Sequence, residues 1–172
     1  MSATGLDVFD KTIQTTNIWL NDIMEAIGPD RQIAWHVLGA VLRALRDRIP
    51  IELAAHLGSQ LPILIRGAYY DQWQPSAAPQ KYRTLDEFID RVSEGLSNIR
   101  PVNRTQAIQA VFGTLSRHVP EGQMLKVFEA LPEDIRTLWV ASPVPSGERS
   151  LSREKRSADR RSAQSREARA QR

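Results

Sequence analysis

The sequence predicts an all-α fold in which two tandem four-helix repeats form one compact helical domain, followed by a disordered C-terminal tail. First, residues 39–70 and 109–140 align without a gap at an offset of 70, and eight of the 32 aligned positions are identical. Second, apolar residues recur at helical spacing in both stretches, and no run alternates apolar with polar residues as strands do. Third, prolines interrupt both stretches at equivalent positions. A repeat of this kind predicts an architecture and leaves the activity open.

The first helix is expected over about residues 5–27, where an amphipathic face runs from Leu6 through Phe9 and Ile13. A Gly-Pro pair ends this helix, and the next one covers about 31–49 and opens the first copy of the repeat.

The prolines define the same order of helices in each copy. Pro50 and Pro120 end an apolar helix, because the proline ring removes a hydrogen-bond donor and crowds the preceding turn. Pro62 and Pro132 suit the first position of a later short helix, where a missing amide hydrogen costs nothing. The identical pairs are Ala40/Ala110, Val41/Val111, Leu45/Leu115, Pro50/Pro120, Leu61/Leu131, Pro62/Pro132, Ile65/Ile135 and Arg66/Arg136.

Helix starts are marked by side chains that can cap them. Asp30 suits the N-cap of the second helix. Thr84 with Glu87 three residues later forms a capping-box pattern, and Asn103 with Gln106 repeats the pattern before the helix of the second copy.

Helical spacing also predicts which side chains are buried. The helix after Pro62 is expected to bury Leu64, Ile65, Ala68 and Tyr69. Leu45 and Leu115 are expected at equivalent positions of the core.

These signals predict a duplicated helical domain over residues 1–142. Its first repeat covers about 5–70, a connector with two prolines and small residues covers 71–83, and the second repeat covers about 84–140. A basic tail rich in arginine and serine covers 143–172 and is expected to be disordered, because it has too few apolar residues to offset its ordering entropy.

The composition excludes several kinds of site. The chain has no cysteine, so disulfides, thiol catalysis and zinc–thiolate sites are excluded. No secretory signal peptide and no apolar run of about 18 residues are visible, so we expect a cytoplasmic protein without a membrane partner.

The positive net charge comes from the tail. Residues 148–172 hold nine of the 23 basic residues and four of the 20 acidic ones, so the rest of the chain is slightly acidic. Cations in a disordered segment can bind a nucleic acid or another polyanion through counterion release. The candidate contacts are Arg153, Lys155, Arg156, Arg160 and Arg161.

Two strings in the first half and one in the second carry a family resemblance. The strings are AVLRALRDRIP at 40–50, QLPILIRGAYYDQW at 60–73 and the LP…R…LW pattern at 131–139. Over roughly residues 10–140 the chain resembles the bacterial "domain of unknown function 2267" family. The resemblance implies an all-helical, internally duplicated and mostly bacterial domain, and it carries no catalytic residues or cofactor that could be transferred.

The most distinctive candidate interaction surface combines Arg66 with Tyr70, Trp73 and Arg46. Arginine and aromatic side chains are typical anchors of protein interfaces and anion sites. The alternative is a structural role for Arg66, which would pair with an aspartate or a helix C-terminus. Arg136 occupies the same position of the repeat and favours that alternative, because a duplicated fold repeats its structural contacts.

Arg43, Arg46 and Arg48 place three cations on the second helix. They could contact a phosphate or an acidic partner. A solvated helix face is the alternative that we favour from the sequence.

No motif predicts a catalytic residue, a cofactor or a metal site. The three histidines, His36, His56 and His118, fall on three predicted helices without a metal-binding spacing, and no nucleophile motif or glycine-rich phosphate loop is present.

The sequence therefore predicts a non-enzymatic interaction or regulatory module with an unknown protein partner. One alternative is polyanion or nucleic-acid binding through the tail. A second alternative is an enzyme or binder of a small acidic ligand held between the repeats by Arg66 or Arg136.

The tail hypothesis predicts a salt-dependent interaction. The full chain should be retained on immobilised heparin or DNA and eluted by moderate salt, whereas a chain cut after residue 147 should pass through. Retention that ignores both the salt concentration and the truncation would contradict the hypothesis.

Overall fold

The computed structural model describes residues 2–139, which form eight α-helices and one short 3₁₀ helix without any strand. The all-α fold class is thus confirmed for this part of the chain. The elements are α1 (Asp7–Ile27), α2 (Arg31–Arg48), α3 (Ile51–Gln60), α4 (Ile63–Tyr70), η1 (Pro75–Ala77), α5 (Leu85–Glu94), α6 (Arg104–His118), α7 (Glu121–Ala130) and α8 (Glu133–Arg136). The predicted tail lies outside the described residues.

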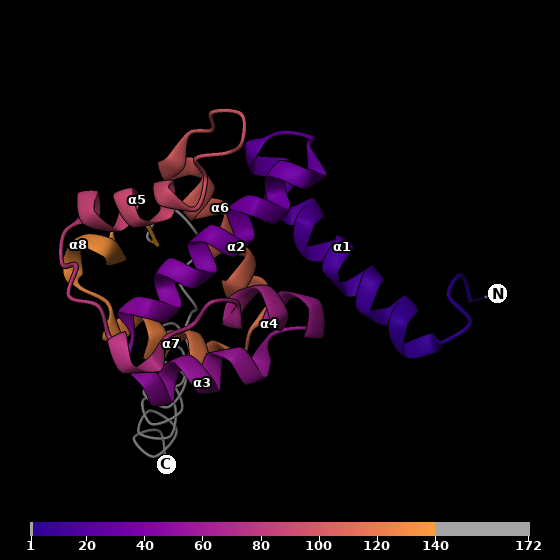
Figure 1. The fold of residues 1–172 in the computed structure, drawn as a ribbon, viewed down its shortest axis with the longest axis horizontal. Coiled ribbons are helices and arrows are strands. Elements are labelled where there is room, and N and C mark those ends of the chain that lie inside the picture. The colour runs from indigo at the N-terminus through magenta and orange to yellow at the C-terminus, as the bar shows by residue number, and fades with distance from the viewer. Residues whose placement is uncertain (1, 140–172) are drawn as a thin grey trace, which may run out of the picture.

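Two helices form the centre of the molecule. Helix α2 packs against α1, α4, α5 and α6, and α6 packs in turn against α1, α5 and α7 (Figure 1). Helix α3 lies between α4 and α7 and joins the two halves of the chain. The largest fully buried side chains of the described residues are Trp139, Tyr69, Phe88, Phe112, Ile23, Leu38, Leu42, Leu45, Ile49, Leu57, Leu61 and Ile65.

The helix breaks fall where the prolines predict them. Helices α3 and α7 both have ten residues and begin directly after Pro50 and Pro120, which serve as their N-caps. Pro62 and Pro132 are the N-caps of α4 and α8, one position before the first helical position expected from the sequence. Helix α8 has four residues where α4 has eight. These bounds agree with a duplicated sequence, and the division into two four-helix repeats stays a prediction.

The predicted caps are present, with one difference. The side chain of Asp30 accepts a hydrogen bond from the Ile33 amide, and Thr84 forms a complete capping box with Glu87. Asn103 caps α6, but Gln106 does not reach back to it as a capping box requires. The side-chain amide of Gln106 instead donates to the carbonyl of Ala26 at 2.7 Å, which ties the start of α6 to the end of α1.

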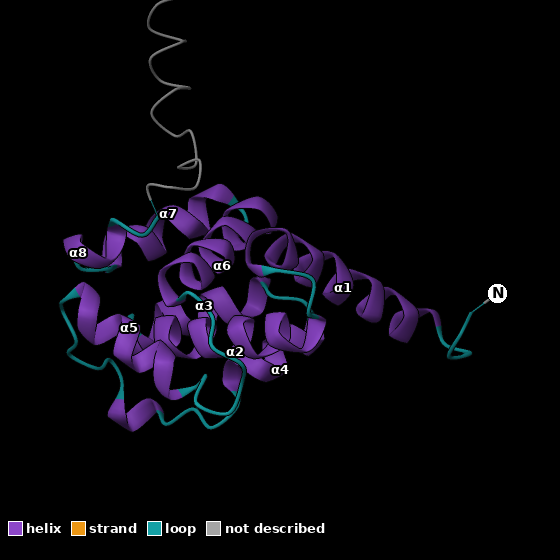
Figure 2. Ribbon diagram, turned by 90° about the horizontal axis from the view of Figure 1, so that it is seen from above, coloured by secondary structure: helices purple, strands orange, loops and turns teal. Residues whose placement is uncertain are grey.

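Burial differs from the prediction in two places. Leu64 is 44% exposed, because only Ile65 and Tyr69 of the short α4 face the core. Phe9 and Ile13 are 57% and 45% exposed, because the N-terminal half of α1 projects beyond the other helices (Figures 1 and 2). The amphipathic face of α1 was predicted correctly, but only its C-terminal half is covered.

The connector between the two halves is tied to α2. The amide of Gln80 donates to the carbonyl of Asp47 at 2.6 Å, and Arg48 donates to the carbonyl of Tyr82 at 2.7 Å. The hydroxyl of Tyr82 donates to the carbonyl of Ala44. These bonds hold the loop after α4 against the side of α2. None of the helices described here is long and apolar enough to cross a membrane.

Core burial makes a quantitative prediction about stability. Leu45→Ala and Leu115→Ala should each lower the free energy of unfolding by about 2–5 kcal/mol, because both side chains are fully buried. Leu64→Ala is the matched control and should cost less than about 1 kcal/mol, because Leu64 is exposed. Chemical denaturation of the three variants checks this, and equal losses at all three positions would show that the core is placed wrongly.

Candidate functional site

Arg66 has a structural role in the described part of the chain. Its guanidinium donates from Nε and Nη2 to the carbonyl of Leu61, at 3.2 and 2.9 Å, and from Nη2 to the carbonyl of Ser59 at 3.0 Å. These acceptors lie at the C-terminus of α3, whose last carbonyls have no partner within the helix. Arg66 is therefore a helix cap, as the structural alternative predicts, and it pairs with no aspartate.

Arg136 makes the equivalent bonds in the second half. It donates from Nε to the carbonyl of Leu131 at 2.7 Å and from Nη2 to the carbonyl of Glu129 at 2.6 Å, at the end of α7. Both acceptors stand 70 residues after those of Arg66. The same cap thus occurs at both aligned positions, and neither arginine is free to hold a small ligand as its main function.

Tyr70 and Trp73 are half-buried and pack against one another, with ring centroids 5.4 Å apart and ring planes tilted by 34°. The hydroxyl of Tyr70 donates to the carbonyl of Ala55 at 3.3 Å, and its ring fills the space above Gly58, where a Cβ atom would clash. Trp73 lies 6.0 Å from the guanidinium carbon of Arg46. The aromatic pair therefore packs at the junction of α3 and α4, and part of its surface stays exposed.

Arg46 lies in the interior, which corrects both interpretations made from the sequence. It is only 2% exposed, so it belongs neither to a solvated helix face nor to an accessible interaction surface. Its Nη1 donates to the carbonyls of Tyr69 and Asp71 at 2.6 and 2.9 Å, which caps the C-terminus of α4. The sequence pattern could not show this, because the helix α4 that covers Arg46 is more than 15 residues away along the chain.

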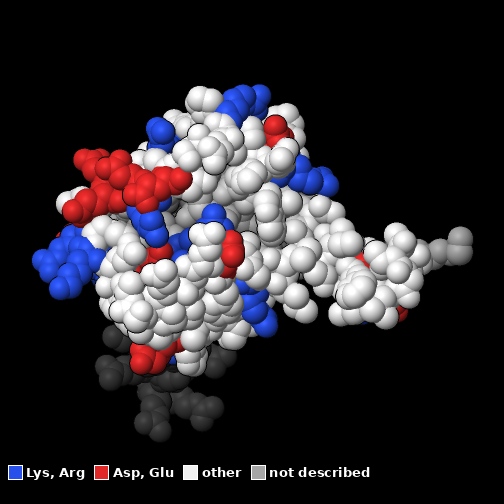
Figure 3. Space-filling model, viewed as in Figure 1, with Lys and Arg blue, Asp and Glu red and all other residues white. Residues whose placement is uncertain are grey.

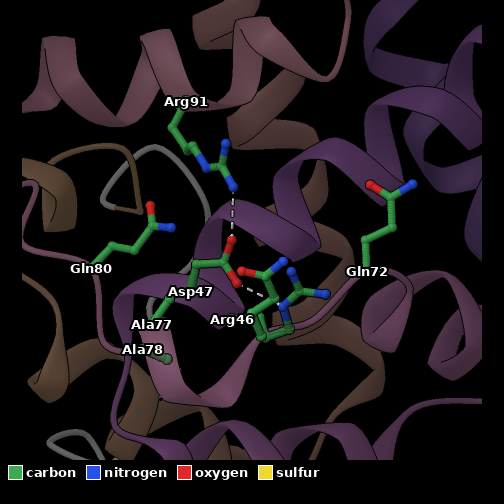
Figure 4. Close-up of a pocket in the computed structure, with 8 residues that line it drawn as sticks. Arg46, Asp47, Gln72, Ala77, Ala78, Gln80 and Arg91 are labelled. Carbon is green, nitrogen blue, oxygen red and sulfur yellow. Dashed lines mark hydrogen bonds and ion pairs between the residues drawn. The ribbon is translucent and has the colours of Figure 1, made fainter.

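A single buried carboxylate joins the two halves. Asp47, itself 5% exposed, accepts a hydrogen bond from Nε of Arg46 at 2.8 Å and another from Nη2 of Arg91 at 3.0 Å. Arg91 lies on α5, and Figure 4 shows it reaching Asp47. Arg91 also pairs with Glu94 at 2.5 Å. Charges taken out of water in this way are tolerated only when they are paired and hydrogen-bonded.

Two adjoining hollows open beside this ion pair. One of about 260 Å³ lies against the connector and the other, of about 270 Å³, lies between α2 and α5. Arg46, Gln72 and Arg91 line both hollows, so we treat them together as the α2–α5 hollow. Its other lining residues are Ala40, Arg43, Ala44, Asp47, Asp71, Gln74, Ala77, Ala78, Gln80, Glu94 and Gly95.

Two features of the α2–α5 hollow set it apart from an ordinary surface depression. Gln72 has a φ of 55°, in the left-handed region that residues other than glycine seldom adopt and that often accompanies functional sites. Arg43 is half-buried, and burial lowers the pKa of its guanidinium, with the like charges of Arg46 and Arg91 acting in the same direction and Asp71 in the opposite one. The hollow thus brings three arginines together with one buried and two exposed carboxylates.

The second distinctive surface is apolar. Most of the exposed large apolar side chains belong to the start of the chain and to α4. They include Leu6, Val8, Phe9, Ile13, Ile18, Ile63 and Leu64. The projecting part of α1 carries few charged groups on the face shown in Figure 3. An open groove of about 370 Å³ separates α1 from the junction of α3 and α4, with Val8 on one side and Ile63 on the other.

The histidines do not assemble into a site. His36 and His56 are exposed, whereas Nε2 of His118 lies 2.6 Å from the carboxylate of Asp22 and its ring stacks on Trp19. These contacts hold α1 on α6. Among the described residues, no group of three or more histidine, aspartate or glutamate side chains could hold a metal ion.

Sequence reasoning missed the partners that form the α2–α5 hollow. Asp47 and Arg91 are 44 residues apart, and no local pattern links them. The candidate polyanion contacts Arg153, Lys155, Arg156, Arg160 and Arg161 lie outside the described residues, so polyanion binding stays a prediction.

The buried ion pair predicts a large difference between two carboxylates that bind the same arginine. Asp47→Ala should lower the free energy of unfolding by about 3–5 kcal/mol, because it leaves the buried Arg46 without its counterion. Glu94→Ala should cost less than about 1 kcal/mol, because that carboxylate is mostly exposed. Urea denaturation checks both variants, and a loss at Glu94 equal to that at Asp47 would contradict this ranking.

Comparison with known families agrees with the resemblance seen in the sequence. The model of a family described as "Uncharacterized conserved protein (DUF2267)" matches residues 16–138. A search of curated proteins gives no match.

Proposed function

The chain belongs to the DUF2267 family, and we propose that it is a non-enzymatic interaction module that binds a partner helix along the exposed half of α1. The partner to which we commit is a second copy of the chain. One observation carries the proposal. The apolar residues between Leu6 and Ile27 form one row along α1, which we call the seam, but the rest of the molecule covers only the C-terminal half of this seam.

The seam has the spacing of a coiled-coil helix. Starting at the N-cap Leu6, apolar residues alternate at intervals of three and four, interrupted only by Thr16. The positions of the seam are Leu6, Phe9, Ile13, Thr16, Leu20, Ile23 and Ile27. A spacing of this regularity supports packing against another helix along the full length of α1.

The C-terminal part of the seam already has its partner. Thr16, Leu20 and Ile23 are buried where α1 packs against α2 and α6. Leu6, Phe9 and Ile13 continue the same seam and are about half exposed. Exposed apolar patches of this kind are typical of interaction sites in soluble proteins.

The chain itself supplies a suitable occupant. In a two-fold symmetric contact the same patch serves both copies, so a self-complementary helix is sufficient. If two copies of α1 pair antiparallel about an axis near residue 11, Phe9 of each copy meets Ile13 of the other. Ile63 and Leu64 of α4 are also exposed, and α4 packs beside α1, so they can extend the contact.

Self-association is tested with the full chain and matched variants. Sedimentation equilibrium should show a concentration-dependent dimer for the wild type. Phe9→Glu and Ile13→Glu should be monomeric at the same concentrations, because each change buries a charge in the seam. Both residues are exposed within one chain, so the variants should keep the helical circular dichroism of the wild type.

The control is Ile18→Glu. Ile18 is as exposed as the seam residues but lies nine residues after Phe9, which places it on the opposite face of α1. This variant should dimerise like the wild type. A wild-type chain that stays monomeric up to about 1 mM would overturn the proposal, because its dimer would then be weaker than about −4 kcal/mol. Equal dimerisation of all three variants would also overturn it.

A further inference from the structure

We propose that the α2–α5 hollow binds a phosphate group between the guanidinium groups of Arg43, Arg46 and Arg91. This inference does not depend on the interaction surface of α1, since no residue of α1 lines the hollow. It concerns a ligand site of different chemistry.

Arg43 is half-buried and has no counterion among the residues that the structure describes. None of the ion pairs among the described residues includes it, and its one hydrogen bond there is a long one, 3.4 Å, from Nη1 to the carbonyl of Ala68. Its position over Gly39 holds it half-buried at the wall of the hollow. A cation withdrawn from water without a partner is costly, and a bound anion removes that cost.

The ion pairs of the hollow leave one of its three guanidinium groups unpaired among the described residues. Both oxygens of Asp47 are already engaged, one by Arg46 and the other by Arg91. The other carboxylates that line the hollow, Glu94 and Asp71, are exposed, and Glu94 pairs with Arg91 at 2.5 Å. Asp47 and Glu94 thus pair with Arg46 and Arg91, and Asp71 attracts Arg43 without forming an ion pair with it. The guanidinium of Arg43 is therefore the cation that stays available to a phosphate oxygen.

The hollow also supplies hydrogen-bond donors. Arg46 uses Nε and Nη1 within the fold, and its Nη2 makes no hydrogen bond to another described residue. Gln72, which lines both parts of the hollow, carries a side-chain amide in its left-handed loop position. A planar guanidinium fork can donate to two oxygens of a phosphate group at once, and an added amide can donate to a third.

The alternative is that the arginines serve the fold alone. Capping of α4 accounts for Arg46, and bonding to Asp47 accounts for much of Arg91. Neither of these two structural roles accounts for Arg43. The second half of the aligned sequence has glycine and serine at the positions of Arg43 and Arg46, namely Gly113 and Ser116. The purely structural cap of Arg66 is found again at Arg136, whereas this cluster occurs in the first half only.

The test uses isothermal titration calorimetry of the full chain with inorganic phosphate and, separately, with phenyl phosphate. Phosphate should bind with a dissociation constant in the millimolar range or below, and Arg43→Gln should weaken it by about tenfold or more. Tighter binding of phenyl phosphate would identify a monoester as the ligand, and equal binding would identify free phosphate. Acetate, a monoanion, should bind more weakly than either.

The matched control is Arg31→Gln. Arg31 lies at the other end of α2, is exposed and donates to Asn17 and Asn21 of α1, so this variant makes the same charge change away from the hollow. It should bind phosphate like the wild type. Two results would overturn the proposal: no binding by the folded wild-type chain up to about 20 mM phosphate, or equal losses in Arg43→Gln and Arg31→Gln. Arg43→Gln should keep the wild-type melting temperature without phosphate, because Arg43 holds no ion pair in the described residues.

Discussion

The burial of α2 is the constraint on which the other features of the molecule depend. Neighbouring helices surround it, so its apolar residues form the centre of the core. Its last two turns also carry charged residues, and these enter the interior with it. Arg46 and Asp47 must then find partners, which they take from the end of α4 and from Arg91 of α5. The docking of α4 and α5 on α2 is thus fixed by polar contacts as well as by apolar burial.

The burial of α2 draws charged residues inside, whereas the length of α1 leaves apolar residues exposed. A helix of 21 residues extends beyond the body against which it packs, so one apolar seam is partly covered and partly exposed. The two surfaces of the molecule therefore have different origins. The α2–α5 hollow arises from charges drawn inward, and the seam of α1 arises from apolar residues left outside.

Much of the fold could be predicted because its signals are local. A proline acts on its own turn, and a capping side chain acts three residues away, so the helix bounds and the caps at Asp30 and Thr84 were visible in the sequence. The aligned positions of Arg66 and Arg136 also indicated a structural role, and both arginines cap the preceding helix. Leu64 was misplaced, because helical spacing does not say how wide the covered face of a short helix is.

The sequence by itself determined that the part of the chain described here is helical, where most of its helices begin, and which family the chain belongs to. Only the tertiary structure decided which helix faces are covered and which charges are drawn inside. Arg46 shows the reason: a cation on an amphipathic helix has the same local pattern whether it faces water or another helix. Its burial depends on Tyr69, Asp71 and Asp47 meeting in space, and that meeting follows from the packing of whole helices rather than from any short stretch of sequence.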